Sequence, residues 1–160
     1  MIGAVFAVDE KGGLGRNGTI PWPYNKEDMR WFKHATTDSV VVMGKRSWNS
    51  PDMIKPLPNR VNCVITNNFL DRNDIEQFKG NVCEGILQLH EKYKDLNLFV
   101  IGGADILMKS KEVLDCAYIT RIPGDYMCDT KIDLANFLSD FKLTNTQDLG
   151  TCTVELYERI

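Results

Sequence analysis

Short runs of apolar, often β-branched residues recur along the chain and predict the strands of a sheet. Most of these runs are apolar on both faces, which is typical of strands that are covered by helices on each side. The predicted strands cover residues 2–8, 39–43, 61–66, 98–101 and 116–122.

The pattern changes near the C-terminus. Val154 and Leu156 alternate with residues 153, 155 and 157, as in a strand with one covered face. Together with residues 141–145, this segment predicts an antiparallel hairpin at the edge of the sheet.

Helical spacing of apolar residues separates most of the strand-like runs. Asn25 is a suitable N-cap for the first helix, and the acids Glu27 and Asp28 fall in its first turn. Alternating strands and helices predict one α/β domain over residues 1–160 with a mixed sheet. The predicted helices cover residues 25–36, 84–93 and 104–109, with a turn or short helix at 133–138.

Composition narrows the function classes. With 160 residues, a net charge of −3 and no long apolar run, the chain lacks the basic field expected for nucleic-acid binding and the length of apolar sequence needed for a membrane span. Its five cysteines are scattered, with no C-x-x-C pair and only two histidines. We therefore expect reduced thiols, no metal site, no membrane or nucleic-acid partner, and a cytoplasmic location.

Residues 13–18, "GLGRNG", spell the G-x-G-x-x-G fingerprint of dinucleotide-binding sites. A true fingerprint opens a helix, whose free N–H groups hold the pyrophosphate. Here Pro21 and Pro23 flank Trp22, so no helix can begin directly after the glycines. We interpret the segment as a long, mobile binding loop or lid, and a plain connector is the alternative.

Two further glycine turns follow predicted strands. In "MGKRS", residues 43–47, Gly44 precedes two cations, which suits a phosphate site, although an ordinary surface pair of basic residues fits equally well. In residues 100–105 a buried strand runs into Gly102 and Gly103, where a ligand or a tight turn needs a close backbone approach. Glycines at three strand ends indicate a ligand that bridges the edge of the sheet.

Asp28 shares a helix face with Phe32 and Ala35. One reading is stabilisation of the helix N-terminus by its charge, which Glu27 could equally supply. The other is a buried acid that binds two parallel N–H groups of a flat, cationic heterocycle.

Together these segments resemble dihydrofolate reductase over nearly the whole chain. The matching pieces keep the family's order and spacing: "GGLGRNGTIPW", "EDMRWFK", "VVMGKRSWNS", "PLPNR", "VIGGADI", "YITRI" and "DT". The resemblance implies a mixed, mostly parallel eight-stranded sheet with an antiparallel C-terminal hairpin and about four flanking helices. It also implies NADPH-dependent reduction of 7,8-dihydrofolate to tetrahydrofolate, in support of one-carbon metabolism and nucleotide synthesis, with sensitivity to antifolate inhibitors. A monomer is expected.

The resemblance implies roles for individual residues on the substrate side. Asp28 corresponds to the one acidic group of the pterin pocket and binds the 2-amino group and adjacent ring nitrogen, with help from Thr120 and a water. Solvent admitted near Trp22 supplies the proton, and the hydride passes to the imine carbon. The implied substrate contacts are Val5, Phe6, Ala7, Met29, Phe32, Ser50, Leu57, Arg60 and Ile101.

On the cofactor side, Lys45 and Arg46 favour NADPH over NADH because a 2′-phosphate needs cations. The resemblance also implies a cis peptide bond between Gly102 and Gly103. The implied cofactor contacts are Ala7, Leu14, Gly15, Gly18, Ile20, Gly44, Lys45, Arg46, Ser47, Thr66, Asn67, Ile101, Gly102, Gly103, Ala104, Asp105 and Ile106.

The chain also departs from the family pattern. One extra residue precedes Asp28, and residues 50–58 carry a small insertion. Asp105 would repel phosphate if it pointed inward, Leu107 replaces a frequent aromatic hydroxyl, and Cys128 replaces a frequent glycine. These differences bear on cofactor affinity more than on activity.

Two alternatives stay open at this point. The related pyrimidinone reductase of riboflavin synthesis shares the fold and NADPH but takes a ribitol-phosphate substrate. A reductase-like binding protein without catalysis is the second alternative.

Overall fold

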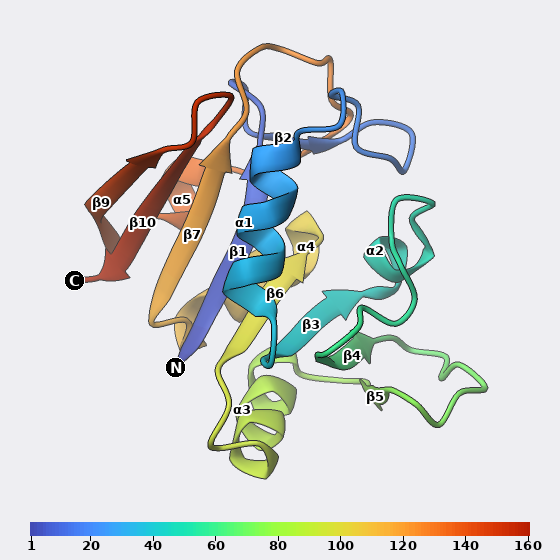
Figure 1. Ribbon diagram of the computed structural model, residues 1–160. Helices are drawn as coiled ribbons and strands as arrows, with labels where there is room; N and C mark the ends of the chain where they lie inside the picture. The colour runs from blue at the N-terminus through green and yellow to red at the C-terminus, as the bar shows by residue number, and fades with distance from the viewer.

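The order of the strands in the main sheet determines which strand ends meet. The computed structural model describes residues 1–160, and its main sheet has eight strands in the order β5-β4-β3-β6-β1-β7-β10-β9 (Figure 1). Neighbours from β5 to β7 are parallel, whereas β10 is antiparallel to both β7 and β9. The strands are β1 Ile2–Val8, β3 Val40–Gly44, β4 Val61–Ile65, β5 Glu76–Phe78, β6 Leu98–Gly102, β7 Cys116–Arg121, β9 Phe141–Asp148 and β10 Thr153–Arg159.

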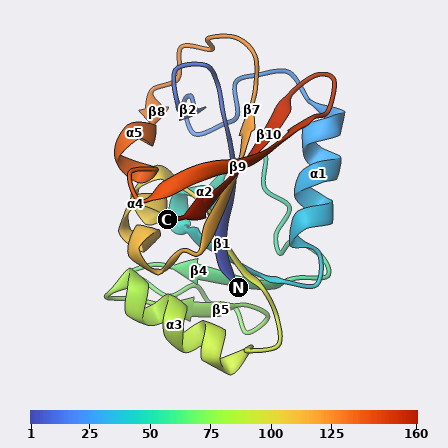
Figure 2. The ribbon, with the colours of Figure 1, turned by 90° about the vertical axis from the view of Figure 1, so that its left-hand side faces the viewer.

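Helices cover both faces of this sheet. Seen along the edge, α1 lies on one side, and α3, α4 and α5 lie on the other (Figure 2). The helices are α1 Lys26–Thr36, α2 Lys45–Asn49, α3 Val82–Lys92, α4 Ala104–Ser110 and α5 Leu134–Phe137, with a short 3₁₀ helix at Lys111–Val113. None of them is both long enough and apolar enough to cross a bilayer.

Strand β3 shows how the sheet separates two cores. Val40 and Val42 belong to the larger cluster, which includes buried side chains of α3, α4 and α5. Val41 and Met43 point to the opposite face, where they pack with Trp48 of α2. Alternate residues of one strand therefore face different cores, which explains why the strand is apolar throughout.

The glycine-rich segment after β1 is more ordered than the sequence analysis predicted. Strand β2, Gly13–Gly15, pairs with β8, Thr130–Lys131, to form a second small sheet. Arg16 and Thr19 then exchange backbone hydrogen bonds of 2.8 and 3.0 Å around Asn17 and Gly18, whose φ angles are 52° and 77°. Positive φ at both central residues is the mark of a type I′ turn, for which Asn-Gly is the preferred pair. The segment is therefore not a loop throughout, because residues 13–19 form a strand and a tight turn. Its mobility and its role as a lid stay predictions.

The other predicted elements are present, with shifts of one to three residues at several ends. Three short strands, β2, β5 and β8, were not predicted, and there are five α-helices rather than about four. Asn25 caps α1, and its side chain accepts the N–H of Asp28 at 3.0 Å. The register shift between β10 and β9 skips Thr144 of β9, whereas β10 keeps its alternation against β7. Tyr157 pairs with Ala117 and packs on the main core.

Candidate functional site

A large cavity opens where β1, β3, β4 and β6 end and where α1, α2 and α4 begin. Its volume is about 1240 Å³, above the roughly 300–1,000 Å³ of common ligand sites, so there is room for two ligands side by side. Every residue that the sequence analysis assigned to catalysis, substrate or cofactor lines this cavity. Parallel strands bring these residues together because their carboxyl ends lie at one edge of the sheet.

Asp28 is the acid at the helical wall of the cavity. It is half-buried in the first turn of α1 and forms no ion pair. Removal from water raises the pKa of its carboxyl, while the side chain of Thr120 acts in the opposite direction. Thr120 is buried on β7, where it pairs with Ala7 of β1. A desolvated carboxylate without a cationic partner is suited to bind a cationic ligand.

Trp22 is buried even though it lies between two prolines. It packs against Tyr126 with ring centroids 5.9 Å apart, and it shares a small cluster with Ile122, Cys128 and Cys152. Since Trp22 also lines the cavity, it forms a wall between this cluster and the site.

Residues 13–20, which comprise β2 and the type I′ turn with its tip at Asn17, are called the β2 hairpin, and two carboxylates hold it in place. Asp9, which is fully buried, accepts N–H groups of Lys11, Gly13 and Tyr126 at 2.8–3.0 Å. Asp129 accepts the N–H of Asn17 at the hairpin tip at 3.0 Å. The hairpin is therefore fixed both at its base and at its tip.

Cys128 is one of the departures noted in the sequence. Its thiol donates to Asp9 at 3.4 Å, and burial, followed by the neighbouring Asp9, raises the pKa of Cys128 to about 11. The thiol therefore stays protonated and acts as a packing group and hydrogen-bond donor. All five cysteines are free.

Two glycine turns, which follow β3 and β6, line another part of the cavity. The peptide bond between Gly102 and Gly103 is cis, as the resemblance implied, and Gly103 caps α4. A Cβ at Gly44 would lie 2.9 Å from Ile106, and one at Gly102 would lie 3.3 Å from the Ser47 hydroxyl. The turn after β3 therefore packs closely on α4, and the turn after β6 packs closely on α2. Gly44, Gly102 and Gly103 all line the cavity.

Positive charge without acidic partners lies beside these turns. Lys45 and Arg46 begin α2, and neither forms an ion pair. Asp105 instead pairs with Lys109 at 3.0 Å, and its side chain is 73% exposed. The phosphate repulsion considered for Asp105 is thus reduced, because its charge faces solvent and has a partner.

Arg60 lies beside Thr36, the last residue of α1. Its Nη1 donates to Thr36 at 2.9 Å, its Nε donates to the carbonyl of Pro58 at 2.9 Å, and its guanidinium lies 5.9 Å from the Phe32 ring centre. Burial lowers the pKa of its guanidinium from the ordinary value, which still leaves it charged. Its remaining N–H groups are available to a carboxylate.

Several cavity residues were missed by the sequence analysis. Trp31 packs on Tyr118, and its buried Nε1 has no hydrogen-bond partner. Its position three residues after Asp28 placed it on the same helix face, so the spacing was an available signal. Asp52, in the insertion after α2, also lines the cavity and contacts Ile20, and no local pattern pointed to it.

This arrangement suits the binding of two different ligands in contact. One end offers backbone and cations for phosphates, and the other offers a carboxylate, aromatic walls and an arginine. No cluster of three or more His, Cys, Asp or Glu side chains is placed to hold a metal ion.

Comparisons with known proteins agree with this picture. The family model described as "Dihydrofolate reductase" matches residues 1–157. The bifunctional dihydrofolate reductase-thymidylate synthase of Paramecium tetraurelia is 34% identical over 144 residues, which cover 89% of this chain but only 30% of that protein. The dihydrofolate reductase of Heliothis virescens is 32% identical over 146 residues, covering 79% of this chain and 75% of that protein.

A solved structure is similar as well. The Enterococcus faecalis dihydrofolate reductase, complexed with NADP(H) and RAB-propyl, superposes with a TM-score of 0.83 at 27% identity. The match covers 99% of this chain and 96% of that one.

Proposed function

This chain belongs to the dihydrofolate reductase family and reduces dihydrofolate with NADPH, and from that premise we propose how its own residues divide the work. The observation that carries the proposal is Asp28, a half-buried acid without a cationic partner in the wall of the large cavity. Asp28 binds the pterin ring, and the two glycine turns bind the cofactor.

On the substrate side, the Asp28 carboxylate accepts N–H groups of the 2-amino group and the adjacent ring nitrogen. Its negative charge favours the protonated form of the substrate, because a desolvated anion interacts strongly with a cation across the ring. Protonation of the imine makes its carbon electrophilic. Thr120 holds the carboxylate in place, and the raised pKa of Asp28 supports a site kept partly from water.

The proton comes from solvent that enters beside Trp22. Its indole separates the cavity from the cluster with Tyr126, and Asp28 and Thr120 lie on the same cavity. Trp22 thus limits how many waters reach the ring, which preserves the charge interaction.

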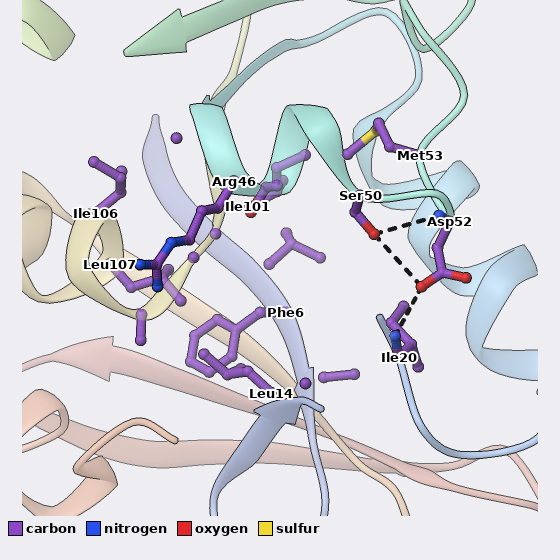
Figure 3. A pocket seen from close by; sticks show the side chains of 18 of the residues that line it. Phe6, Leu14, Ile20, Arg46, Ser50, Asp52, Met53, Ile101, Ile106 and Leu107 are labelled. Atoms are coloured by element: carbon purple, nitrogen blue, oxygen red, sulfur yellow. Dashed lines mark hydrogen bonds between the residues drawn. The ribbon is translucent and has the colours of Figure 1, made fainter. Parts of the chain in front are cut away.

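On the cofactor side, the residues present fit NADPH. Its reduced nicotinamide supplies the hydride. Lys45 and Arg46 would hold the 2′-phosphate, and the backbone at Gly102 and Gly103 would hold the pyrophosphate, where a Cβ would meet Ser47. Leu14 and Ile20 of the hairpin segment would cover the nicotinamide half (Figure 3).

The remaining walls bind the rest of the substrate. Met29, Phe32 and Leu57 line the cavity between Asp28 and Arg60, a path suited to an aromatic ring. Arg60 grips the carboxylate of the glutamate tail with the donors left after its bonds to Thr36 and Pro58.

We also propose that the chain acts as a monomer in the cytoplasm and that antifolate inhibitors occupy the Asp28 end of the cavity. The five free cysteines support a reducing compartment. The inhibitor in the similar Enterococcus faecalis structure supports the last proposal.

Of the alternatives, the pyrimidinone reductase is not favoured by the family match. An inactive binding protein would show no turnover. Loss of the NADPH absorbance, measured once with dihydrofolate and once with the pyrimidinone substrate, separates all three.

The test compares wild type, Asp28→Asn and the matched control Glu27→Gln. Glu27 is the neighbouring acid, lies outside the cavity and accepts the Thr151 hydroxyl at 3.1 Å. We expect Asp28→Asn to lose about 100-fold or more in turnover at neutral pH, whereas Glu27→Gln stays within about twofold. Equal turnover in Asp28→Asn and wild type would refute the assignment.

A further inference from the structure

The hairpin segment touches the insertion after α2 at one point. The backbone N–H of Ile20 donates to the carboxylate of Asp52 at 2.7 Å, across 32 positions of sequence. Ile20 and Asp52 both line the cavity, and they approach it from different segments (Figure 3). This contact therefore joins two segments of the cavity wall.

The Asp52 carboxylate is held for this contact. Its own N–H donates to the Ser50 hydroxyl at 3.3 Å, and that hydroxyl lies 3.5 Å from the same carboxylate oxygen that accepts from Ile20 (Figure 3). The N–H of Met53 donates to the Ser50 carbonyl at 3.0 Å. Asp52 therefore sits in a tight local turn, which limits the entropy lost in binding Ile20.

The donor side is restricted as well. Ile20 precedes Pro21, so its backbone is biased to an extended conformation. Pro21 and Pro23 have no N–H, so Ile20 provides one of the few backbone donors near Trp22. The type I′ turn closed by Arg16 and Thr19 immediately before Ile20 makes this part of the chain a firm unit. Holding Ile20 therefore holds the hairpin tip.

We propose that Asp52 is a positioning residue: it latches the segment at Ile20 over the cavity and controls the release of cofactor and product. The proposal rests on the proposed function, because Ile20 is assigned there to the nicotinamide half and Ser50 to the substrate walls. Asp129 binds the tip at Asn17, so two carboxylates from different loops hold the same short segment. Ligand exchange requires the bond to Asp52 to open.

Three variants separate this role from a general effect of charge or folding. Asp52→Ala removes the acceptor, and Asp52→Asn keeps a side-chain carbonyl of the same shape without the charge. Asp71→Ala is the matched control, since Asp71 is an exposed loop aspartate outside the cavity. Melting temperature verifies that each variant folds.

Two measurements then decide the proposal. In the free protein, we expect amide hydrogen exchange at Ile20 to be about tenfold faster in Asp52→Ala, intermediate in Asp52→Asn and unchanged in Asp71→Ala. In the NADPH complex, we expect the dissociation rate constant to rise about fivefold in Asp52→Ala, and less in Asp52→Asn.

Unchanged exchange at Ile20 in Asp52→Ala would overturn the latch. Faster exchange with an unchanged NADPH dissociation rate would overturn its positioning role. Equal behaviour of Asp52→Asn and Asp52→Ala would overturn the hydrogen-bonded latch, because the effect would then come from the charge of Asp52 alone. Failure of the wild type to bind NADPH would instead refute the proposed function, and the exchange at Ile20 would still test the latch.

Discussion

The carboxylate of Asp9 accepts the backbone N–H of Tyr126 at 3.0 Å and thereby joins two loops 117 positions apart in the chain. The same side chain accepts N–H groups of Lys11 and Gly13 at 2.9 and 2.8 Å. One fully buried anion thus fixes the base of the β2 hairpin to the loop that leads to β8. The cavity wall at Trp22 depends on this connection, because Tyr126 packs on its ring.

Replacing Asp9 by Asn should destabilise the protein in a pH-dependent way. Burial alone would raise the pKa of Asp9, but the N–H groups of Tyr126, Gly13 and Lys11 outweigh it and leave the pKa below its ordinary 3.8. The charged form therefore stabilises the fold above that pH, and the contribution is lost as the pH falls through the lowered value.

We expect Asp9→Asn to cost about 2 kcal/mol at neutral pH, a fall of about 4–8 °C in melting temperature. The difference from wild type should shrink in acid below about pH 4. Thermal melts across that range measure both effects. A melting difference that stays constant down to the acid limit would contradict the role of the Asp9 charge.

Gly13 and Cys128 should show a strong coupling. A Cβ at Gly13 would lie 2.5 Å from both Cβ and Sγ of Cys128 and 2.9 Å from an oxygen of Asp9. Gly13→Ala should therefore cost about 2–3 kcal/mol by overpacking. Cys128→Gly in the same chain should recover part of this loss, because it removes the two closest atoms. A double-mutant cycle of unfolding free energies provides the measurement, and simple additivity would rule out the predicted clash.

Arg60→Gln should weaken substrate binding selectively. Because its guanidinium is assigned to the glutamate tail, we expect the KM for dihydrofolate to rise about 10- to 100-fold, with little change in the affinity for NADPH. A pterin substrate without the glutamate tail should bind wild type and variant equally. If that truncated substrate suffers the same loss, Arg60 acts on the fold through Thr36 rather than on the tail.

Lys45→Gln and Arg46→Gln should change the choice of cofactor. Both cations lack acidic partners and stand at the start of α2, so removing either should weaken NADPH binding about tenfold. NADH has no 2′-phosphate, and its binding should hardly change. Equilibrium titration of both cofactors gives the two affinities, and an equal loss for NADPH and NADH would disprove the phosphate assignment.

Much of the fold could be predicted because its signals are local. Strand β3, Val40–Gly44, is apolar on both faces. The helix after Asn25 has a cap and acids in its first turn. Strand β5, Glu76–Phe78, has three residues and no apolar pattern, so only its pairing with β4 defines it. Pairing of β2 with β8 likewise depends on contacts more than 100 residues apart.

The features of the site likewise divide into those with a local sequence pattern and those that depend on distant contacts. Glycine turns and Asp28 could be found because each has a sequence pattern and a matching family motif. The type I′ turn at Asn17 and Gly18 was missed although Asn-Gly is a strong local signal, because the prolines that follow exclude a helix and the segment was therefore interpreted as a loop. The bond between Asp52 and Ile20 could not be foreseen, since it depends on where two loops meet across the cavity.

The central claim is that the Asp28 charge makes the bound pterin ready to accept hydride, and the pH dependence of turnover tests it most directly. Asp28→Asn cannot favour the protonated substrate, so its rate should rise in acid, where the substrate arrives already protonated. Wild type should instead lose activity in acid as Asp28 takes up a proton through its raised pKa. The ratio of wild-type to Asp28→Asn turnover should therefore be about 100 or more near neutral pH and fall steadily towards about pH 5. A ratio that stays constant across this range would contradict the account.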